Sequence, residues 1–158
     1  MALLNPGDAF PEVPLTTTDG VKRPVTAALA GSYGVVLFYR GSWCPYCMAQ
    51  LRAFQRASAA FAETGVKVVA LSVDDAETTA ETVAKHNLDF PVGHSADAHA
   101  VAAATGAFVN ADPLYVQSSG FVLDPEGRVV VSVYSSGAIG RLVPDDVLGL
   151  VKYVKEHA

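Results

Sequence analysis

The sequence predicts an α/β fold in which a central β-sheet of mixed direction is flanked by helices on both faces, with a β-hairpin at the N-terminal end. Residues 35–39 and 66–73 are nearly continuous apolar runs, which is typical of strands covered on both faces. Between them, residues 45–62 carry apolar side chains at helical spacing. Two more strand patterns and a helix pattern complete the chain. The predicted order is therefore β-α-β, a helical connection, and then β-β-α.

Length and composition indicate one globular domain. The chain has 158 residues, of which 51% are hydrophobic and 17% charged, so it has enough apolar material for a substantial core and is not held open by its own charge. With 11 Lys and Arg against 16 Asp and Glu, the net charge is −5, and we expect no nucleic-acid partner because phosphate binding needs a basic excess. No apolar run approaches the roughly 20 residues that span a bilayer, and residues 1–8 lack the features of a secretion signal. We therefore expect a single domain over residues 1–158, no membrane partner and a cytoplasmic location.

The hairpin is predicted within the first 30 residues. Short strand-like segments flank Asp19-Gly20, a dipeptide that favours a tight turn. Pro14 and Pro24 place both segments at sheet edges, because proline cannot donate a backbone hydrogen bond to a neighbouring strand. The returning segment is expected to extend to Val25.

The helix over residues 45–62 begins with Pro45, a residue favoured at the first helical position because its φ is already fixed. Gly65 follows the helix and suits its C-terminal cap. Helical spacing assigns Gln50 to a side of the helix that faces away from the core. The inward-facing stripe is expected to contain Cys47, Leu51, Phe54, Ser58 and Phe61.

The second half of the chain alternates helix and strand signals before its final helix. Asp74 and Asp75 follow a strand and precede a helix that runs to about Asn87, so both are expected to cap it. Residues 106–117 show no clear period and are predicted to form a loop. Pro144 is expected to start the last helix. The remaining predicted elements are a strand at 90–92, a helix at 98–105, and strands at 119–124 and 128–134 joined by a type I turn at 124–127.

The two cysteines, Cys44 and Cys47, are the most informative feature of the chain. They flank Pro45-Tyr46 at a strand-to-helix junction, and residues three apart in a first helical turn are close enough for a disulfide. Cys44 is expected at the N-cap, where unpaired N–H groups and the helix dipole stabilise a thiolate and lower the thiol pKa from about 8.5. A thiolate is the nucleophile in disulfide exchange and in attack on a peroxide.

Two other interpretations of the cysteine pair are less favoured. Buried structural thiols do not account for a C-x-x-C motif at a strand-to-helix junction in a chain expected in the cytoplasm. A zinc site would need about four ligands, and His94 and His99 are the only histidines at a suitable spacing. We therefore expect a redox-active pair, with neither a metal nor another cofactor.

Residues 37–54 surround the cysteine pair and read Leu-Phe-Tyr-Arg-Gly-Ser-Trp-Cys-Pro-Tyr-Cys-Met-Ala-Gln-Leu-Arg-Ala-Phe. This segment resembles the active-site region of thioredoxin-fold redox proteins, and in particular the peroxiredoxin-like branch of the alkyl hydroperoxide reductase and thiol-specific antioxidant (AhpC/TSA) family. The resemblance extends over nearly the whole chain through residues 6–11, 69–74, 90–92 and 120–127. It implies a thioredoxin-like fold and an antioxidant, thiol-based oxidoreductase.

The resemblance also suggests roles for individual residues. The family's peroxidatic cysteine falls on Cys47, whereas Cys44 stands where the family has a threonine and where thioredoxins have their attacking cysteine. Gln50-Leu51 stand where a Glu-Leu pair often follows the peroxidatic cysteine. An arginine in a Gly-Arg pair of the family matches Arg141.

Three positions depart from the patterns of these families. Arg40 stands where peroxiredoxins have a proline, and a cation at this position is expected to stabilise a thiolate or a bound peroxide oxygen. Ser118 stands near the position of the activating arginine of peroxiredoxins and of the cis-proline of thioredoxins. Phe38 replaces the aspartate that thioredoxins bury beneath their cysteines.

We expect a thiol-dependent peroxidase in which Cys47 attacks hydrogen peroxide or an organic hydroperoxide, and Cys44 condenses with the resulting sulfenic acid to give a disulfide. A thioredoxin or a low-molecular-weight thiol would reduce that disulfide. The predicted catalytic set is Cys47, Cys44, Arg40 and Arg141, and the predicted lip for a substrate or partner is Trp43, Tyr46 and Ser118.

Two alternatives stay open on the sequence. In a thioredoxin-like disulfide reductase, Cys44 would attack a substrate disulfide and Cys47 would resolve the mixed disulfide, which is the usual division where the first cysteine is the more exposed. In a redox-sensing binding module, the disulfide would change a docking surface without turnover. Because members of the family often pair through a sheet edge or the active-site face, a homodimer is a further expectation.

Overall fold

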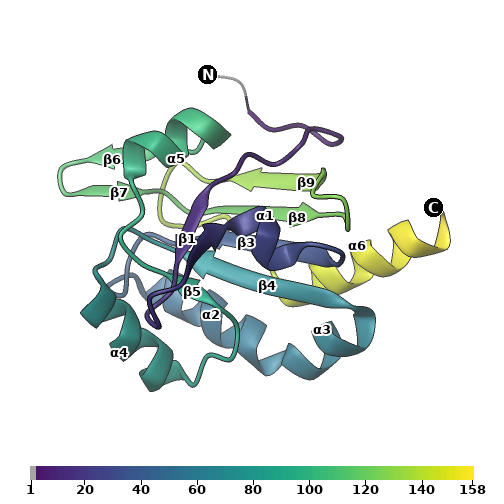
Figure 1. Cartoon of the computed structure of the whole chain (residues 1–158), viewed down its shortest axis with the longest axis horizontal. Helices are drawn as coiled ribbons and strands as arrows, with labels where there is room; N and C mark the ends of the chain where they lie inside the picture. Colours follow the sequence, from purple (N-terminus) through teal and green to yellow (C-terminus); the bar gives the residue numbers. More distant parts are fainter. Residues whose placement is uncertain (1–2) are drawn as a thin grey trace.

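The computed structural model describes residues 3–158, so Met1 and Ala2 of the segment considered for a secretion signal lie outside the described residues. The central sheet is formed by β3 (Tyr33–Phe38), β4 (Val66–Leu71), β5 (Val92–Gly93), β8 (Ser119–Leu123) and β9 (Val129–Tyr134). Its strand order is β5-β4-β3-β8-β9 (Figure 1). The pairs β3–β4 and β4–β5 are parallel, whereas β8 is antiparallel to both β3 and β9. The predicted sheet of mixed direction is confirmed.

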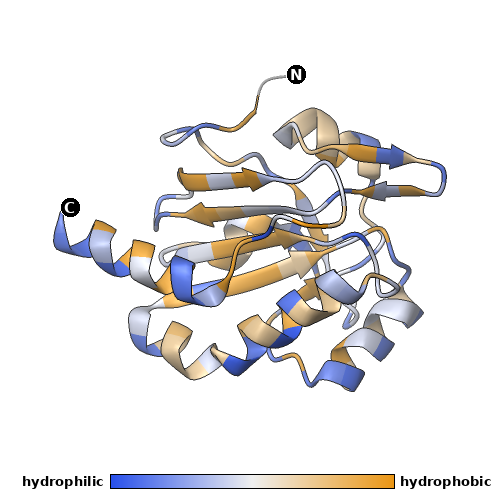
Figure 2. Ribbon diagram, turned by 180° about the vertical axis from the view of Figure 1, so that it is seen from behind, coloured by the Kyte–Doolittle hydropathy of each residue, from blue (hydrophilic) through white to orange (hydrophobic). Residues whose placement is uncertain are grey.

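Alternate residues of β3 pack into two apolar clusters on opposite faces of the sheet. Val35 and Leu37 belong to one cluster, and Val36 and Phe38 belong to the other. The first face is covered by α2 (Pro45–Arg56), α3 (Ser58–Thr64), α4 (Ala76–His86) and α6 (Pro144–Glu156), and the second by α1 (Val25–Leu29) and α5 (Ala98–Thr105). Figure 2 shows strands that are mostly hydrophobic and helices that carry both kinds of residue, which is the pattern expected of a sheet buried on both faces.

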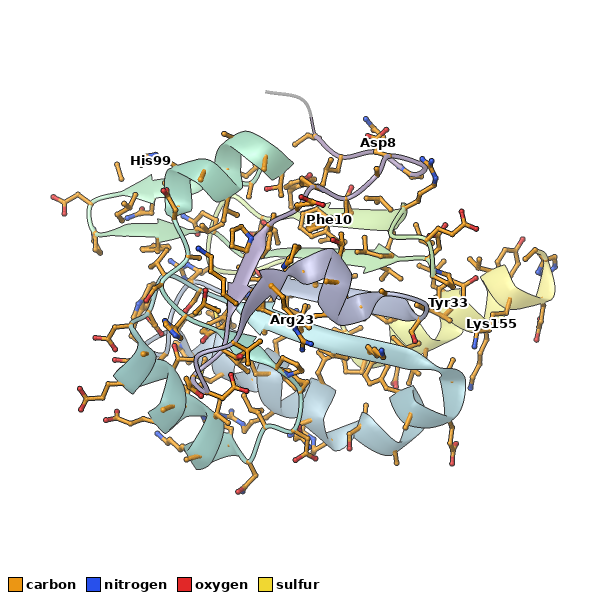
Figure 3. The ribbon with its side chains drawn as sticks, viewed as in Figure 1. Asp8, Phe10, Arg23, Tyr33, His99 and Lys155 are labelled. Carbon is orange, nitrogen blue, oxygen red and sulfur yellow. The ribbon has the colours of Figure 1, made fainter. Side chains whose placement is uncertain are left out.

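The predicted N-terminal hairpin is confirmed. β1 (Pro14–Thr16) pairs antiparallel with β2 (Lys22–Pro24), and Gly20 in the turn has a φ of 86°. The returning strand ends one residue earlier than expected, because Val25 begins the short helix α1. Phe10, which precedes the hairpin and is labelled in Figure 3, packs edge-on against Phe121 of β8 with ring centroids 5.1 Å apart.

The single helix predicted over residues 45–62 is instead two helices, α2 and α3, separated at Ala57. The break changes the helical register, so Ser58 is exposed rather than inward-facing, whereas Phe61 is buried as expected. Gln50 is buried rather than outward-facing, because its Nε2 donates a hydrogen bond to the Leu142 carbonyl at 3.0 Å. Gly65 caps α3 in the left-handed conformation, as predicted.

Residues 106–117 are not the loop that the sequence predicts. β6 (Val109–Ala111) and β7 (Leu114–Val116) form a small antiparallel hairpin around Asp112-Pro113, and Figure 1 shows it beside α5. Each strand has only three residues, which are too few for a two-residue period to stand out. This hairpin carries a residue of the active site.

The later helices begin where the sequence predicts. Asp75 is the N-cap of α4 and accepts a hydrogen bond from the Thr78 N–H at 2.8 Å, and α6 begins at Pro144. Near the C-terminal end of α6, Lys155 lies over the ring of Tyr33 at 5.5 Å, and Figure 3 shows the two side by side. Within the described part of the chain, no helix combines the length and the apolar character needed to cross a bilayer.

Candidate active site

The cysteine pair lies at the junction between β3 and α2. The buried strand ends at Phe38, a short loop follows, and Cys44 is the N-cap of α2. Cys44 Sγ accepts a hydrogen bond from the Cys47 N–H at 3.2 Å, so the sulfur satisfies one of the free N–H groups of the first turn. Pro45 occupies the first helical position. The predicted placement of Cys44 at the N-terminus of a helix is confirmed.

Two arginines lie against the sulfur of Cys44. Arg40 Nη1 is 3.8 Å from Cys44 Sγ, and Arg141 Nη2 is 3.6 Å from it. Arg40 belongs to the loop just before the cysteines, whereas Arg141 belongs to the segment between β9 and α6. Because a guanidinium group keeps its charge at any physiological pH, two positive charges face one sulfur atom.

Ser118 lies beneath Arg141. The serine immediately precedes β8 and is buried, and its Oγ accepts a hydrogen bond from Arg141 Nη1. Arg141 Nη2 also donates to the Ala138 carbonyl at 2.9 Å. These contacts hold the guanidinium group towards Cys44. Ser118 is therefore a neighbour of an arginine, and its role in a substrate lip stays a prediction.

Burial and hydrogen bonding shift the two thiol pKa values in opposite directions. Burial raises the pKa of Cys44, but hydrogen bonds from Cys47 and Arg40 and the charge of Arg141 outweigh it, so that the pKa lies below its usual range. Burial raises the pKa of Cys47 to about 11, although its Sγ accepts a hydrogen bond from the Arg40 N–H at 3.3 Å. In the reduced protein, these contacts therefore favour the thiolate form at Cys44 more than at Cys47.

Neither sulfur is at the surface, since both cysteines have a relative exposure of 0%. The disulfide-reductase alternative expects Cys44 to be the more exposed, and the structure does not meet that expectation. Trp43 and Tyr46, by contrast, are each 54% exposed, so the cysteines lie next to two exposed aromatic rings. Arg40, whose Nη1 lies against Cys44 Sγ, is itself only half-buried.

Tyr115 contacts the site, although the sequence does not point to it. Its hydroxyl accepts a hydrogen bond from Arg40 Nη2 at 2.9 Å, and its ring packs edge-on against Trp43 with centroids 5.0 Å apart. Tyr115 belongs to β7, within the segment that the sequence predicts as a loop. No local pattern marks this tyrosine, because its contact with Arg40 spans 75 residues of chain.

Asp74 is the second residue whose contact with the site the sequence does not predict. Its Oδ2 accepts a hydrogen bond from the Ser42 N–H at 2.8 Å and so ties the loop before Cys44 to the end of β4. The expectation that Asp74 caps α4 is wrong, because Asp75 alone is the N-cap and Asp74 faces the neighbouring loop. Burial raises the pKa of Asp74. The parallel pairing of β3 and β4 is the signal that could have placed it here, since the ends of both strands lie at one sheet edge.

A family model described as the AhpC/TSA family matches residues 6–132. The chain belongs to the AhpC/TSA family. It is 31% identical over 147 residues to a peroxiredoxin of Methanothermobacter marburgensis, covering 89% of this chain and 68% of that protein. It is also 31% identical over 155 residues to a peroxiredoxin of Chlorobaculum tepidum, covering 94% of this chain and 72% of that protein. The resemblance seen in residues 37–54 is confirmed.

Solved structures of the AhpC/TSA type share the fold. The crystal structure of the peroxidoxin BcpB from Mycobacterium tuberculosis superimposes with a TM-score of 0.82 at 21% identity, covering 96% of this chain and 98% of that chain. A peroxiredoxin-like protein from Aquifex aeolicus also superimposes with a TM-score of 0.82, at 20% identity, covering 98% of this chain and 90% of that chain. The predicted thioredoxin-like fold is confirmed.

The chemistry of this AhpC/TSA site is that of thiols and cations. Among residues 3–158, no three or more His, Cys, Asp or Glu side chains lie together in a way that could hold a metal ion. The guanidinium groups of Arg40 and Arg141 would also repel a metal cation at Cys44. The same two groups attract the negative charge that forms on an oxygen when a peroxide bond breaks.

Proposed function

We propose that this AhpC/TSA chain is a thiol-dependent peroxidase that reduces hydrogen peroxide or an organic hydroperoxide through a dithiol–disulfide couple of Cys44 and Cys47. One observation carries this proposal. A helix N-terminus and two guanidinium groups, those of Arg40 and Arg141, converge on Cys44 Sγ, while the second thiol lies in the same helical turn. The relationship to peroxiredoxins supports the same class of reaction.

The geometry favours Cys44 for the first attack, which reverses the order expected from the family resemblance. The Cys44 thiolate forms an S–O bond with one peroxide oxygen as the O–O bond breaks, giving a sulfenic acid and an alkoxide or hydroxide. That anion takes a proton from solvent and leaves as an alcohol or water. Cys47 then attacks the Cys44 sulfur, an S–S bond forms, and the sulfenic oxygen leaves as water. An external dithiol, or two molecules of a monothiol, reduces the disulfide.

Single-cysteine variants test both the activity and the order of attack. We expect Cys47→Ser to consume about one equivalent of peroxide per chain and to form a sulfenic acid that dimedone traps at Cys44. We expect Cys44→Ser to react much more slowly with the same peroxide. Trapping at Cys47 with a fast Cys44→Ser variant would restore the order expected from the family resemblance. Failure of the wild type to consume any peroxide with any thiol donor would overturn the peroxidase proposal.

One observation favours a second candidate function, that of a thioredoxin-like disulfide reductase. Trp43 and Tyr46 are exposed beside Cys44, whose pKa is below its usual range, and exposed aromatic rings suit contact with a protein partner. Burial of both sulfurs opposes this candidate, because a protein disulfide is bulkier than a peroxide. A Cys47→Ser variant that accumulates mixed disulfides with proteins would favour the reductase, and an absence of such adducts would exclude it.

We further propose a thioredoxin or a low-molecular-weight thiol as the reductant. Peroxiredoxins act on peroxides and depend on thiol partners, and the exposed Trp43 and Tyr46 offer a contact surface beside the disulfide. Turnover of peroxide with thioredoxin and its reductase, compared with glutathione, identifies the donor. A homodimer and a cytoplasmic location stay predictions. The mass of the particle in solution, measured by sedimentation velocity, tests the homodimer.

A further inference from the structure

The guanidinium group of Arg40 lies between two aromatic rings. Its Cζ is 4.9 Å from the centroid of the Trp43 ring and 5.2 Å from that of the Tyr115 ring. The same guanidinium group has two directed contacts, from Nη2 to the Tyr115 hydroxyl at 2.9 Å and from Nη1 to Cys44 Sγ at 3.8 Å. Fixing Nη2 therefore fixes the direction in which Nη1 points, because the guanidinium group is planar and rigid.

Each arginine at Cys44 is held by one hydroxyl group, and both hydroxyl groups come from a single short segment. Tyr115 accepts a hydrogen bond from Arg40, and Ser118, three residues later, accepts one from Arg141. Both side chains are buried. The segment is anchored at its base, since the Gln117 N–H donates to the Phe108 carbonyl at 2.8 Å across the β6–β7 hairpin.

We propose that Tyr115 is a positioning residue of the peroxidase, and that its hydroxyl group orients Arg40 towards the sulfur of Cys44. Ser118 does the same for Arg141. The catalytic role of Tyr115 rests on the proposed function. The orientation of the Arg40 charge towards the Cys44 sulfur can be tested without peroxide. An arginine side chain released from such a partner regains several rotamers and spends less time at the sulfur.

Tyr115→Phe is the sharpest test, because it removes the hydroxyl group and keeps the ring that packs on Trp43 and Arg40. In a Cys47→Ala background, we expect the pH midpoint for alkylation of Cys44 by iodoacetamide to move upward. We also expect the rate of peroxide reduction near neutral pH to fall by about tenfold, which is the effect of a hydrogen bond to a charged group at the lower end of its usual range. Tyr153→Phe, at an exposed tyrosine of α6, is the matched control and should change neither quantity.

A double-mutant cycle separates positioning from packing. If the Tyr115 hydroxyl acts through Arg40, Tyr115→Phe should have no further effect once Arg40→Met is present. Ser118→Ala should still raise the alkylation midpoint in the Arg40→Met background, but not in an Arg141→Met background. This second arm keeps the inference testable should Tyr115→Phe fail to fold.

Three outcomes decide the matter. A shifted alkylation midpoint that disappears in the Arg40→Met background supports the positioning role, even if no variant reduces peroxide, in which case only the proposed function fails. An unshifted midpoint in Tyr115→Phe overturns the inference. A shift of equal size with and without Arg40 also overturns it, because the tyrosine would then act on Cys44 by another route.

Discussion

Removal of the positive charge of Arg141 tests whether the arginines hold Cys44 as a thiolate. Arg141 Nη2 lies 3.6 Å from Cys44 Sγ. Two opposite unit charges about 4 Å apart attract by about 1 kcal/mol in water and by about 4 kcal/mol near a protein surface. Since a change of about 1.4 kcal/mol corresponds to one unit of pKa, Arg141→Met should raise the pKa of Cys44 by about one to three units. Burial of Cys44 favours the upper part of this interval.

The assay is alkylation of Cys44 by iodoacetamide as a function of pH in a Cys47→Ala background, because the rate follows the thiolate fraction. Arg141→Lys keeps a positive charge and should shift the midpoint less than Arg141→Met. Arg128→Met is the matched control, since Arg128 donates to the Gly7 carbonyl at 3.0 Å and not to a sulfur, and it should leave the midpoint unchanged. An unchanged midpoint in a folded Arg141→Met protein would refute the electrostatic account of the Cys44 thiolate.

Three other perturbations follow from the same site. Asp74→Ala should lower the free energy of unfolding by about 1–3 kcal/mol, because the Ser42 N–H loses its acceptor. Asp74→Asn keeps an acceptor oxygen and should be at least as stable as the wild type at neutral pH. The reason is that burial raises the pKa of Asp74, so the ionised carboxylate lowers the stability of the wild type above that pKa. This cost disappears as the pH falls through the pKa. Urea denaturation at several pH values measures both variants, and an Asp74→Asn variant that is less stable than the wild type at neutral pH would contradict this account. Gly41→Ala should move the Trp43 indole, because an added Cβ would collide with it, and an unchanged tryptophan emission spectrum would argue against that contact. In the wild type, the ultraviolet absorbance of the thiolates should show that Cys44 ionises with a pKa below its usual range and Cys47 with a pKa of about 11. Two overlapping titrations near the usual thiol pKa would contradict this assignment.

The local part of the site is predictable because it depends on neighbours in the sequence. The apolar run that forms β3 and the proline at position 45 together set the strand-to-helix junction and place Cys44 at the N-cap. Other elements depend on packing that no local pattern reports. Ala57 ends α2 although alanine is the best intrinsic helix former, and the hairpin β6–β7 is too short for its period to be recognised.

By itself, the sequence determined that two thiols stand at the start of a helix beneath a buried strand, and that an arginine precedes them. Only the tertiary structure decided which of the two thiols is surrounded by positive charge. Strand β8 pairs antiparallel with β3 and places Ser119 opposite Phe38, so Ser118, and through it Arg141, reaches the loop that carries Arg40. Sheet order brings Arg141 within 4 Å of the sulfur atom that Arg40 faces from the same loop, and sheet order results from the packing of the whole core rather than from any local pattern.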